Sequence, residues 1–396
     1  MLRAYKYRLY PNSGQSAKIE QHFGSCRLVW NLALSAKRYA YESNRITVSR
    51  YDLQKQLVEL KSEHDWLYDI NSQSLQSVLL HLDSAYSNFF KGGGFPKYKS
   101  KIGHQSFQCP QGVLVDFGCG TISLPKIKFI NTRFSKQFSG KIKTCTISRT
   151  PTRKYFISIL VENDFELPVK PPVIKATTIG IDVGIKSFVV TSDGRTYEPN
   201  RFLKNSLKRL KCLQRRACRK KKGSNNRKKS NLHVARLHEK ITNQRTDYIH
   251  KITTELIGDN QTETFVIENL NIAGMVNNRK LSQAISDVAF GELFRQMKYK
   301  SDWYGKNLIE IDRFAPSSKK CSACGVINTS LTLADREWTC NSCGTHHHRD
   351  ENAAINIEEF GLQQTILNNK TPEGIREEPV ELRRLRRAKK QESMLV

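Results

Sequence analysis

Two pairs of cysteines, each with the spacing Cys-X-X-Cys, lie near the C-terminal end of the sequence. They are Cys321 with Cys324 and Cys340 with Cys343, and a glycine follows the second cysteine of each pair. A turn of this spacing directs two sulfur atoms at one point, and two such turns supply the four thiolates of a closed tetrahedral zinc site. We therefore predict one structural Zn²⁺ bound by these four cysteines.

Three consecutive histidines, His346, His347 and His348, follow the second cysteine pair. Because four thiolates already fill a tetrahedral zinc site, the histidines are not needed as ligands. We interpret them as a solvated turn or as contacts to phosphate.

Three acidic residues stand at the ends of apolar segments. Asp182 follows the strand-like segment TIGI, Glu268 closes the strand-like segment TFVI, and Asp350 begins the helix-like segment DENAAINIEEF. An acid at a helix start can simply complement the helix dipole. Charged residues at the buried ends of strands are costly, however, unless they are paired or bind metal. We predict that the three carboxylates bind two catalytic Mg²⁺ ions, which Mn²⁺ could replace, in a centre that cleaves phosphodiesters.

The sequence is strongly basic. Lys and Arg number 65 against 37 acidic residues in 396, which gives a net charge of +28. A surplus of this size favours nucleic acid as a partner. Seventeen of the basic residues, with one acid, lie in residues 201–245.

Leucines at helical spacing on both sides of RKKKGSNNRKKS predict that residues 201–245 form two basic helices joined by a turn. The alternative is a helical hairpin that is merely solvated. We predict nucleic-acid contact because counterion release rewards this density of cations, with Arg215, Arg216, Arg219 and Lys220 as the candidate residues. The pattern alone does not choose between RNA and DNA.

The elements that must position these residues change in type along the chain. Residues 2–10 alternate like a strand, and apolar spacing then predicts helices up to the glycines at 92–94. The β-branched and aromatic residues of 106–161 predict a small β-barrel or sandwich that the first strand joins. Prolines at 168, 171 and 172 indicate a linker, so we expect a new domain to begin near Val173.

Other features bear on the environment of the protein. The sequence has no apolar run of eighteen residues, no signal-peptide pattern and no lipidation motif, so we expect a soluble intracellular protein without a membrane partner. The chain has ten cysteines, of which four form the two pairs and six are scattered, a distribution that fits a reducing compartment.

Several motifs, in this order and spacing, resemble the transposon-encoded TnpB (OrfB) family, compact RNA-guided nucleases that are ancestral to type V CRISPR effectors. They are IGIDVGIK, VIENLNI, RFAPSSKKCSACG, CNSCG and HRDENAAINI, and the segments YKYRLYPN and GFPKYKSK extend the resemblance over nearly the whole chain. Each motif alone is weak, and the combination is specific.

The resemblance implies an α+β multidomain fold. Its expected parts are a wedge-type β-barrel (1–12 and 95–172), an inserted helical recognition domain (13–94), an RNase H-like (RuvC) α/β nuclease domain with the basic hairpin 201–245 (173–314 and 346–361) and an inserted zinc-binding domain that binds target nucleic acid (315–345). The polar composition and mixed charge of the last residues predict a disordered tail (362–396).

The resemblance also implies that Asp182, Glu268 and Asp350 are the catalytic metal-binding triad. Two positions depart from the family, whose members often carry Asp where this chain has Asn269 and His348. Neither position replaces a member of the triad.

The function implied is that of an RNA-guided DNA endonuclease of a transposable element, in the cytoplasm of a prokaryotic cell and at the nucleoid when bound to DNA. A guide RNA derived from the transposon end pairs with double-stranded target DNA next to a short adjacent motif, and one RuvC centre cuts the DNA. The alternatives are a type V CRISPR effector and a guided repressor or transposition accessory protein without cleavage. The presence of all three carboxylates favours a nuclease.

Overall fold

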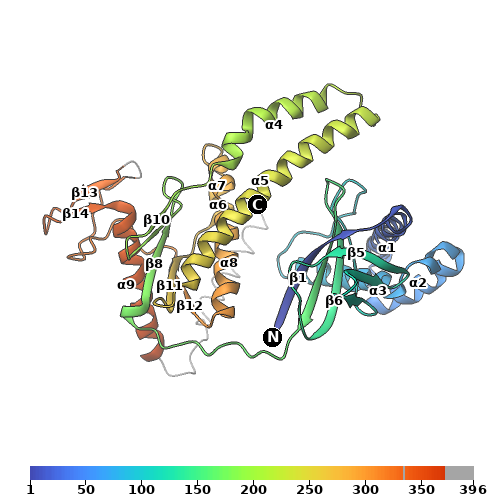
Figure 1. Ribbon diagram of the computed structural model, residues 1–396, viewed down its shortest axis with the longest axis horizontal. Helices are drawn as coiled ribbons and strands as arrows, with labels where there is room; N and C mark the ends of the chain where they lie inside the picture. The colour runs from blue at the N-terminus through green and yellow to red at the C-terminus, as the bar shows by residue number, and fades with distance from the viewer. Residues whose placement is uncertain (333–334, 371–396) are drawn as a thin grey trace. The chain divides into compact units, whose positions relative to one another are not determined.

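The computed structural model describes residues 1–332 and 335–370 (Figure 1). The chain forms two compact units, one made of residues 1–166 with 213–239 and the other of residues 167–212 with those from 240 on. Among the described residues, none of the helices has the length and apolar character needed to cross a lipid bilayer. Most of the predicted tail at 362–396 lies outside the described residues.

A seven-stranded antiparallel sheet forms the framework of the first unit. Its strand order is β2-β6-β7-β1-β5-β4-β3. The strands are β1 (Leu2–Tyr10), β2 (Gln105–Cys109), β3 (Leu114–Asp116), β4 (Thr121–Leu124), β5 (Ile127–Arg133), β6 (Lys141–Arg149) and β7 (Tyr155–Glu162). As the sequence predicts, the first strand joins the later ones, since β1 pairs with both β5 and β7.

The predicted β-barrel is wrong, because the sheet is open. Its edge strands β2 and β3 do not pair with each other, and β3 is only three residues long. The helices of the unit pack on the sheet instead, with α1 (Ser13–Asn44) and α3 (Ser72–Phe90) against β2. Helices and strands share one core, in which Phe23, Leu75 and Phe107 are buried. The apolar face that barrel closure would bury is therefore covered by helices.

The helices of the first unit begin where the sequence supplies capping residues. Asn12 and Gln15 form a capping box at the start of α1, and Ser49 and Asp52 form another at α2 (Arg50–Glu63). These side chains satisfy N–H groups that have no partner inside the helix. A short 3-10 helix, η1 (Asp65–Asp69), precedes α3.

The second unit is built on a five-stranded mixed sheet of order β10-β9-β8-β11-β12. The strands are β8 (Thr178–Val183), β9 (Val189–Thr191), β10 (Thr196–Tyr197), β11 (Thr264–Glu268) and β12 (Asn307–Ile311). The strands β8, β11 and β12 are parallel neighbours, whereas β9 runs antiparallel to β8. The other elements of this unit before the cysteine pairs are η2 (Lys175–Thr177), α6 (Ile272–Val276), α7 (Ser282–Val288) and α8 (Phe290–Trp303). Two long helices, α4 (Phe202–Cys218) and α5 (Asn225–Gly258), belong to it only in part, because residues 213–239 are assigned to the first unit.

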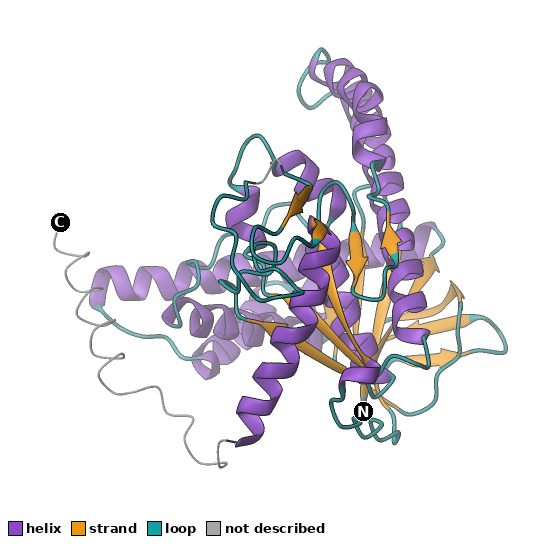
Figure 2. Cartoon of the chain, turned by 90° about the vertical axis from the view of Figure 1, so that its left-hand side faces the viewer, coloured by secondary structure: helices purple, strands orange, loops and turns teal. Residues whose placement is uncertain are grey.

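The last helix, α9 (Arg349–Lys370), packs on β8, β11 and β12, and Figure 2 shows it in front of the strands. A Cβ at Gly180 of β8 would stand 2.0 Å from the Ala354 carbonyl oxygen, and one at Gly361 would stand 2.5 Å from the Val266 side chain. Glycine at these positions thus permits the close approach of helix and sheet. The helix continues past residue 361, where we predict the tail to begin. It is preceded by a two-stranded ribbon, β13 (Glu337–Thr339) and β14 (His346–His348).

Candidate functional site

The three predicted acids lie at one end of the second sheet. Ile181 is paired with Ile267 in the parallel register of β8 and β11, so the next residues along the two strands, Asp182 and Glu268, stand side by side. Asp350 is the second residue of α9, which packs on β8 with Ala353 and Ala354 fully buried. The structure therefore places carboxylates from two strands and a helix at the same end of the sheet, although their oxygen atoms do not all lie within 4.8 Å of one another.

The electrostatics of this site centre on Asp182. Burial, followed by the nearby charges of Glu268 and Asp350, raises the pKa of this carboxyl to about 8. Like charges on neighbouring carboxylates disfavour ionisation of all of them at once. A bound divalent cation would offset this repulsion, so the oxygen-only donor set fits a hard metal such as Mg²⁺.

Two of the acids are held by residues that the sequence patterns do not point to. The Ser317 hydroxyl donates a hydrogen bond of 2.6 Å to Glu268 Oε1. The Arg336 guanidinium donates from Nη1 to both Asp350 oxygens, at 3.1 and 3.4 Å. Ser317 lies in the motif RFAPSSKKCSACG, whereas Arg336 lies between the cysteine pairs in no recognisable motif.

Asn269, one of the two positions that depart from the family pattern, is also engaged in this region. Arg313, which follows β12, donates from Nε to the Asn269 carbonyl oxygen and from Nη2 to its Oδ1, both at 3.3 Å. This contact links the ends of the neighbouring strands β11 and β12. The neutral amide thus connects to the sheet edge without adding another negative charge beside Glu268.

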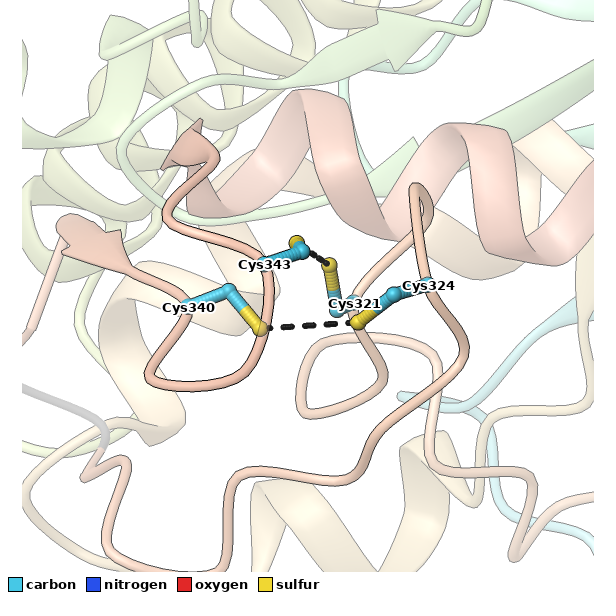
Figure 3. A group of neighbouring side chains, drawn as sticks. All are labelled: Cys321, Cys324, Cys340 and Cys343. Carbon is cyan, nitrogen blue, oxygen red and sulfur yellow. Dashed lines mark hydrogen bonds between the residues drawn. The ribbon is translucent and has the colours of Figure 1, made fainter.

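The four predicted zinc ligands converge from two loops (Figure 3). Their sulfur atoms all lie within 4.8 Å of one another. Among the described residues, no other group of three or more His, Cys, Asp or Glu side chains has its ligand atoms this close together. Cys321 and Cys343 have sulfurs 3.7 Å apart, and those of Cys324 and Cys340 are 3.6 Å apart. Zinc–sulfur bonds of about 2.3 Å in a tetrahedron require sulfurs about 3.8 Å apart. The cluster could therefore hold one Zn²⁺.

The surroundings of two of the four cysteines favour the thiolate form that binds metal. Hydrogen bonds from the Thr345 hydroxyl and from its backbone lower the pKa of Cys343 to about 6. Backbone hydrogen bonds from residues 343 and 342 lower the pKa of Cys340 in the same way. Both effects come from donors that stabilise negative charge on sulfur.

The three histidines do not form the solvated turn that we predict. They make up strand β14, which pairs with β13, and His347 is buried against Trp338. Its Nε2 lies 3.0 Å from Cys321 Sγ. His347 is therefore a neighbour of the cysteine cluster. A strand turns every second side chain inward, but three consecutive histidines show no alternation in the sequence that would predict it.

The predicted basic hairpin is confirmed as two helices, α4 and α5, joined by a short turn. Leu210 and Ala217 of α4 and Leu237 and Ile241 of α5 are buried. The side chains of the four predicted contact residues, Arg215, Arg216, Arg219 and Lys220, are exposed at the end of α4. They are thus available to a polyanion.

Fold and site together define a mixed α/β multidomain protein with an acid cluster at a sheet end and a zinc-type cysteine cluster. Family models agree with this class. A helix-turn-helix domain model of the OrfB group matches residues 1–45, a model described as "Probable transposase" matches 156–279, and a Cas12f1-like TNB domain model matches 290–357.

Individual proteins match over most of their length. A protein of Streptomyces pristinaespiralis is 38% identical over 91% of this chain and 89% of its own. InsQ of Escherichia coli strain K12 is 33% identical over 96% of this chain and 98% of its own. Both carry the provisional name RNA-guided DNA endonuclease. A Cas12f1 complex with single guide RNA and target DNA, solved by electron cryomicroscopy, aligns with a TM-score of 0.37 and 16% identity over 90% of this chain and 99% of that chain.

Relatives of this identity and coverage establish the family. The chain belongs to the TnpB (OrfB) family.

Proposed function

We propose that this protein is an RNA-guided DNA endonuclease. A guide RNA derived from the transposon end pairs with one strand of double-stranded DNA beside a short adjacent motif, and a single RuvC-type centre hydrolyses the DNA strands. The observation that carries the proposal is the convergence of Asp182, Glu268 and Asp350 in a chain with the relatives described above.

The three carboxylates would hold two Mg²⁺ ions in this centre. Bound Mg²⁺ supplies Lewis acidity, which activates water and stabilises the leaving oxygen of the phosphodiester. Ser317 fixes the orientation of the Glu268 carboxylate through its hydrogen bond, and Arg336 does the same for Asp350. Asp182 ionises readily only when positive charge reaches the cluster, because burial and its two acidic neighbours raise its pKa.

The cysteine cluster would hold one structural Zn²⁺ that organises the segment leading into α9. Cys343 and Asp350 are separated by six residues, among them strand β14. A folded zinc module therefore fixes the chain directly before the catalytic helix. Zinc takes no part in bond cleavage, since four thiolates leave no open coordination position.

The alternatives are a type V CRISPR effector, which performs the same chemistry, and a guided repressor or transposition accessory protein that does not cleave. The presence of all three acids, with partners that orient two of them, supports cleavage.

The test begins with the RNA that copurifies with the protein. Sequencing it identifies the scaffold and guide end, and a redesigned guide then directs the protein to a plasmid. The parent protein should cleave this plasmid in Mg²⁺. The Asp182→Ala variant should bind it with similar affinity and cleave it at least about a thousandfold more slowly, because its metal site is incomplete. Cleavage by this variant at the parental rate would refute the assignment of the centre.

A further inference from the structure

A cavity of about 410 Å³ in the second unit lies beside the loop that leaves strand β8, which carries Asp182. It is lined by the β8–β9 loop, the residues at the start of α4 and the α6–α7 region. Its volume is within the range of small-molecule and nucleotide sites, about 300–1,000 Å³. The proposed DNA cleavage leaves this cavity without a role.

Four cations line the cavity, and all four are exposed: Lys186, Arg201, Lys204 and Lys280. Its lining contains a single acid, Asp287, which is buried and already engaged. Asp287 accepts hydrogen bonds from the backbone N–H groups of Leu203 (2.9 Å) and Lys204 (3.0 Å) and from Arg245 Nη2 (3.2 Å). The negative charge of Asp287 is thus already neutralised by the start of α4 and by Arg245. The four cations therefore give the cavity a net positive charge, which suits phosphate.

One buried residue of the lining has a polar atom that lacks a partner. Asn200 is 5% exposed, and its Nδ2 donates a long hydrogen bond of 3.5 Å to the Val288 carbonyl oxygen. Its Oδ1 has no hydrogen-bond partner within the described part of the chain. A buried acceptor without a partner is costly, so this oxygen fits a ligand that brings a hydrogen-bond donor.

We propose that this cavity binds a ribonucleotide of a bound RNA strand. The four cations hold the phosphates on either side of the nucleotide, and Asn200 Oδ1 accepts a hydrogen bond from the ribose 2′-hydroxyl. DNA offers the same phosphates without that hydroxyl, so the contact favours RNA. The inference rests on the function proposed above, because it takes RNA to be a resident partner, and it assigns that partner to one site.

The test measures binding, so its outcome is separate from that of the cleavage experiment. The probes are a fluorescent single-stranded RNA of 20 mixed-sequence nucleotides and DNA of the same sequence. Every ribonucleotide carries a 2′-hydroxyl, so the contact forms in any register. Asn200→Ala should weaken RNA binding about fivefold and leave DNA binding unchanged. The fivefold change corresponds to the loss of one hydrogen bond of roughly 1 kcal/mol. Asn163→Ala is the matched control, because Asn163 is 6% exposed and its Oδ1 also has no partner among the described residues.

A second variant tests the cations independently of the buried residue. Replacing Lys186, Arg201, Lys204 and Lys280 with alanine should weaken binding to both probes and reduce the slope of log affinity against log salt by about 1.5, as expected from the loss of two phosphate contacts to a single strand. An unchanged salt slope, or an Asn200→Ala variant that keeps the parental ratio of RNA to DNA affinity, would overturn the proposal. Equal losses for RNA and DNA in Asn200→Ala would also overturn it, because they indicate a structural role or a DNA contact.

Discussion

Asp182 has the least favourable surroundings of the three acids for carrying a charge. Its pKa is raised to about 8, first by burial and then by Glu268 and Asp350. The folded protein therefore takes up a proton that the unfolded chain releases near pH 4, and the stability contributed by this group falls as pH rises from about 4 to about 8. Without metal, the site costs the protein stability at neutral and alkaline pH.

This linkage predicts the behaviour of Asp182→Asn, which keeps the shape of the side chain and removes its charge. In EDTA at pH 8 the variant should be more stable than the parent by about 2 kcal/mol or more. Below about pH 4, where Asp182 is protonated in both the folded and the unfolded chain, the two should unfold at nearly the same temperature. Adding Mg²⁺ at pH 8 should raise the unfolding midpoint of the parent more than that of the variant. Equal stabilisation at both pH values would contradict the repulsion argued here.

The acids themselves can be predicted from the sequence, because each stands where an apolar strand or helix pattern meets a charge. Their partners cannot. Ser317 reaches Glu268 across 49 positions of sequence, and Arg336 reaches Asp350 from the cysteine-bearing segment. Such contacts depend on tertiary packing, which leaves no periodic signal in the chain.

At the scale of elements, the zinc-type cluster and its neighbouring strand form one local structure. Cys340→Ser should abolish zinc binding, because a single thiolate is a quarter of the ligand set, and should reduce the loading of target DNA. Replacing His346, His347 and His348 together with alanine should leave one zinc per chain. Zinc affinity should fall roughly tenfold or more, since His347 Nε2 contacts Cys321 Sγ.

Metal analysis of the two purified variants, followed by competition with a chelator, measures both effects. Loss of zinc from the histidine variant during purification would show that a histidine is a ligand.

The hairpin of α4 and α5 yields a separate prediction. Neutralising Arg215, Arg216, Arg219 and Lys220 together should weaken retention of the copurifying RNA and lower the salt slope of binding by roughly 3, because each of the four phosphate contacts contributes about 0.7–0.9.

A matched control for the hairpin variant removes four cations that already have carboxylate partners: Arg38, Lys143, Lys170 and Lys251. It changes the net charge equally but removes cations that are locally neutralised, so its slope should stay near that of the parent. Equal salt slopes for the hairpin variant and the control would contradict nucleic-acid contact and support the alternative, in which the hairpin is merely solvated.

Most elements follow from local patterns, since capping residues and apolar periods mark β1, α1 and the strands β8 and β11 in the sequence. Barrel closure does not follow from them. Whether the edges of a twisted sheet meet depends on what covers its apolar face, and here α1 and α3 pack on β2. The three histidines illustrate the same limit, because a run of one residue type hides the alternation that buries His347.

At the scale of the molecule, family membership can be predicted from the sequence because its motifs are spread over both compact units. The arrangement of these motifs in the fold relates their order in the chain to the geometry of the site. The acids come from β8, β11 and α9, and the cysteine-bearing segment lies between the last two. The length of an insertion in a loop can change without moving the acids. A change in the positions of the strand ends, or in the close contact between helix and sheet at Gly180, would separate the carboxylates.

The late position of α9 in the chain also has a consequence during protein synthesis. Asp350 leaves the ribosome 82 residues after Glu268, an interval of roughly 4–16 s at typical rates of translation. Until then the sheet carries two acids and lacks the helix that brings the third. The seven-stranded sheet, whose last strand ends at Glu162, is already complete at that time. A nascent chain can therefore begin to fold its first unit, and meet RNA, well before it holds a complete cutting centre.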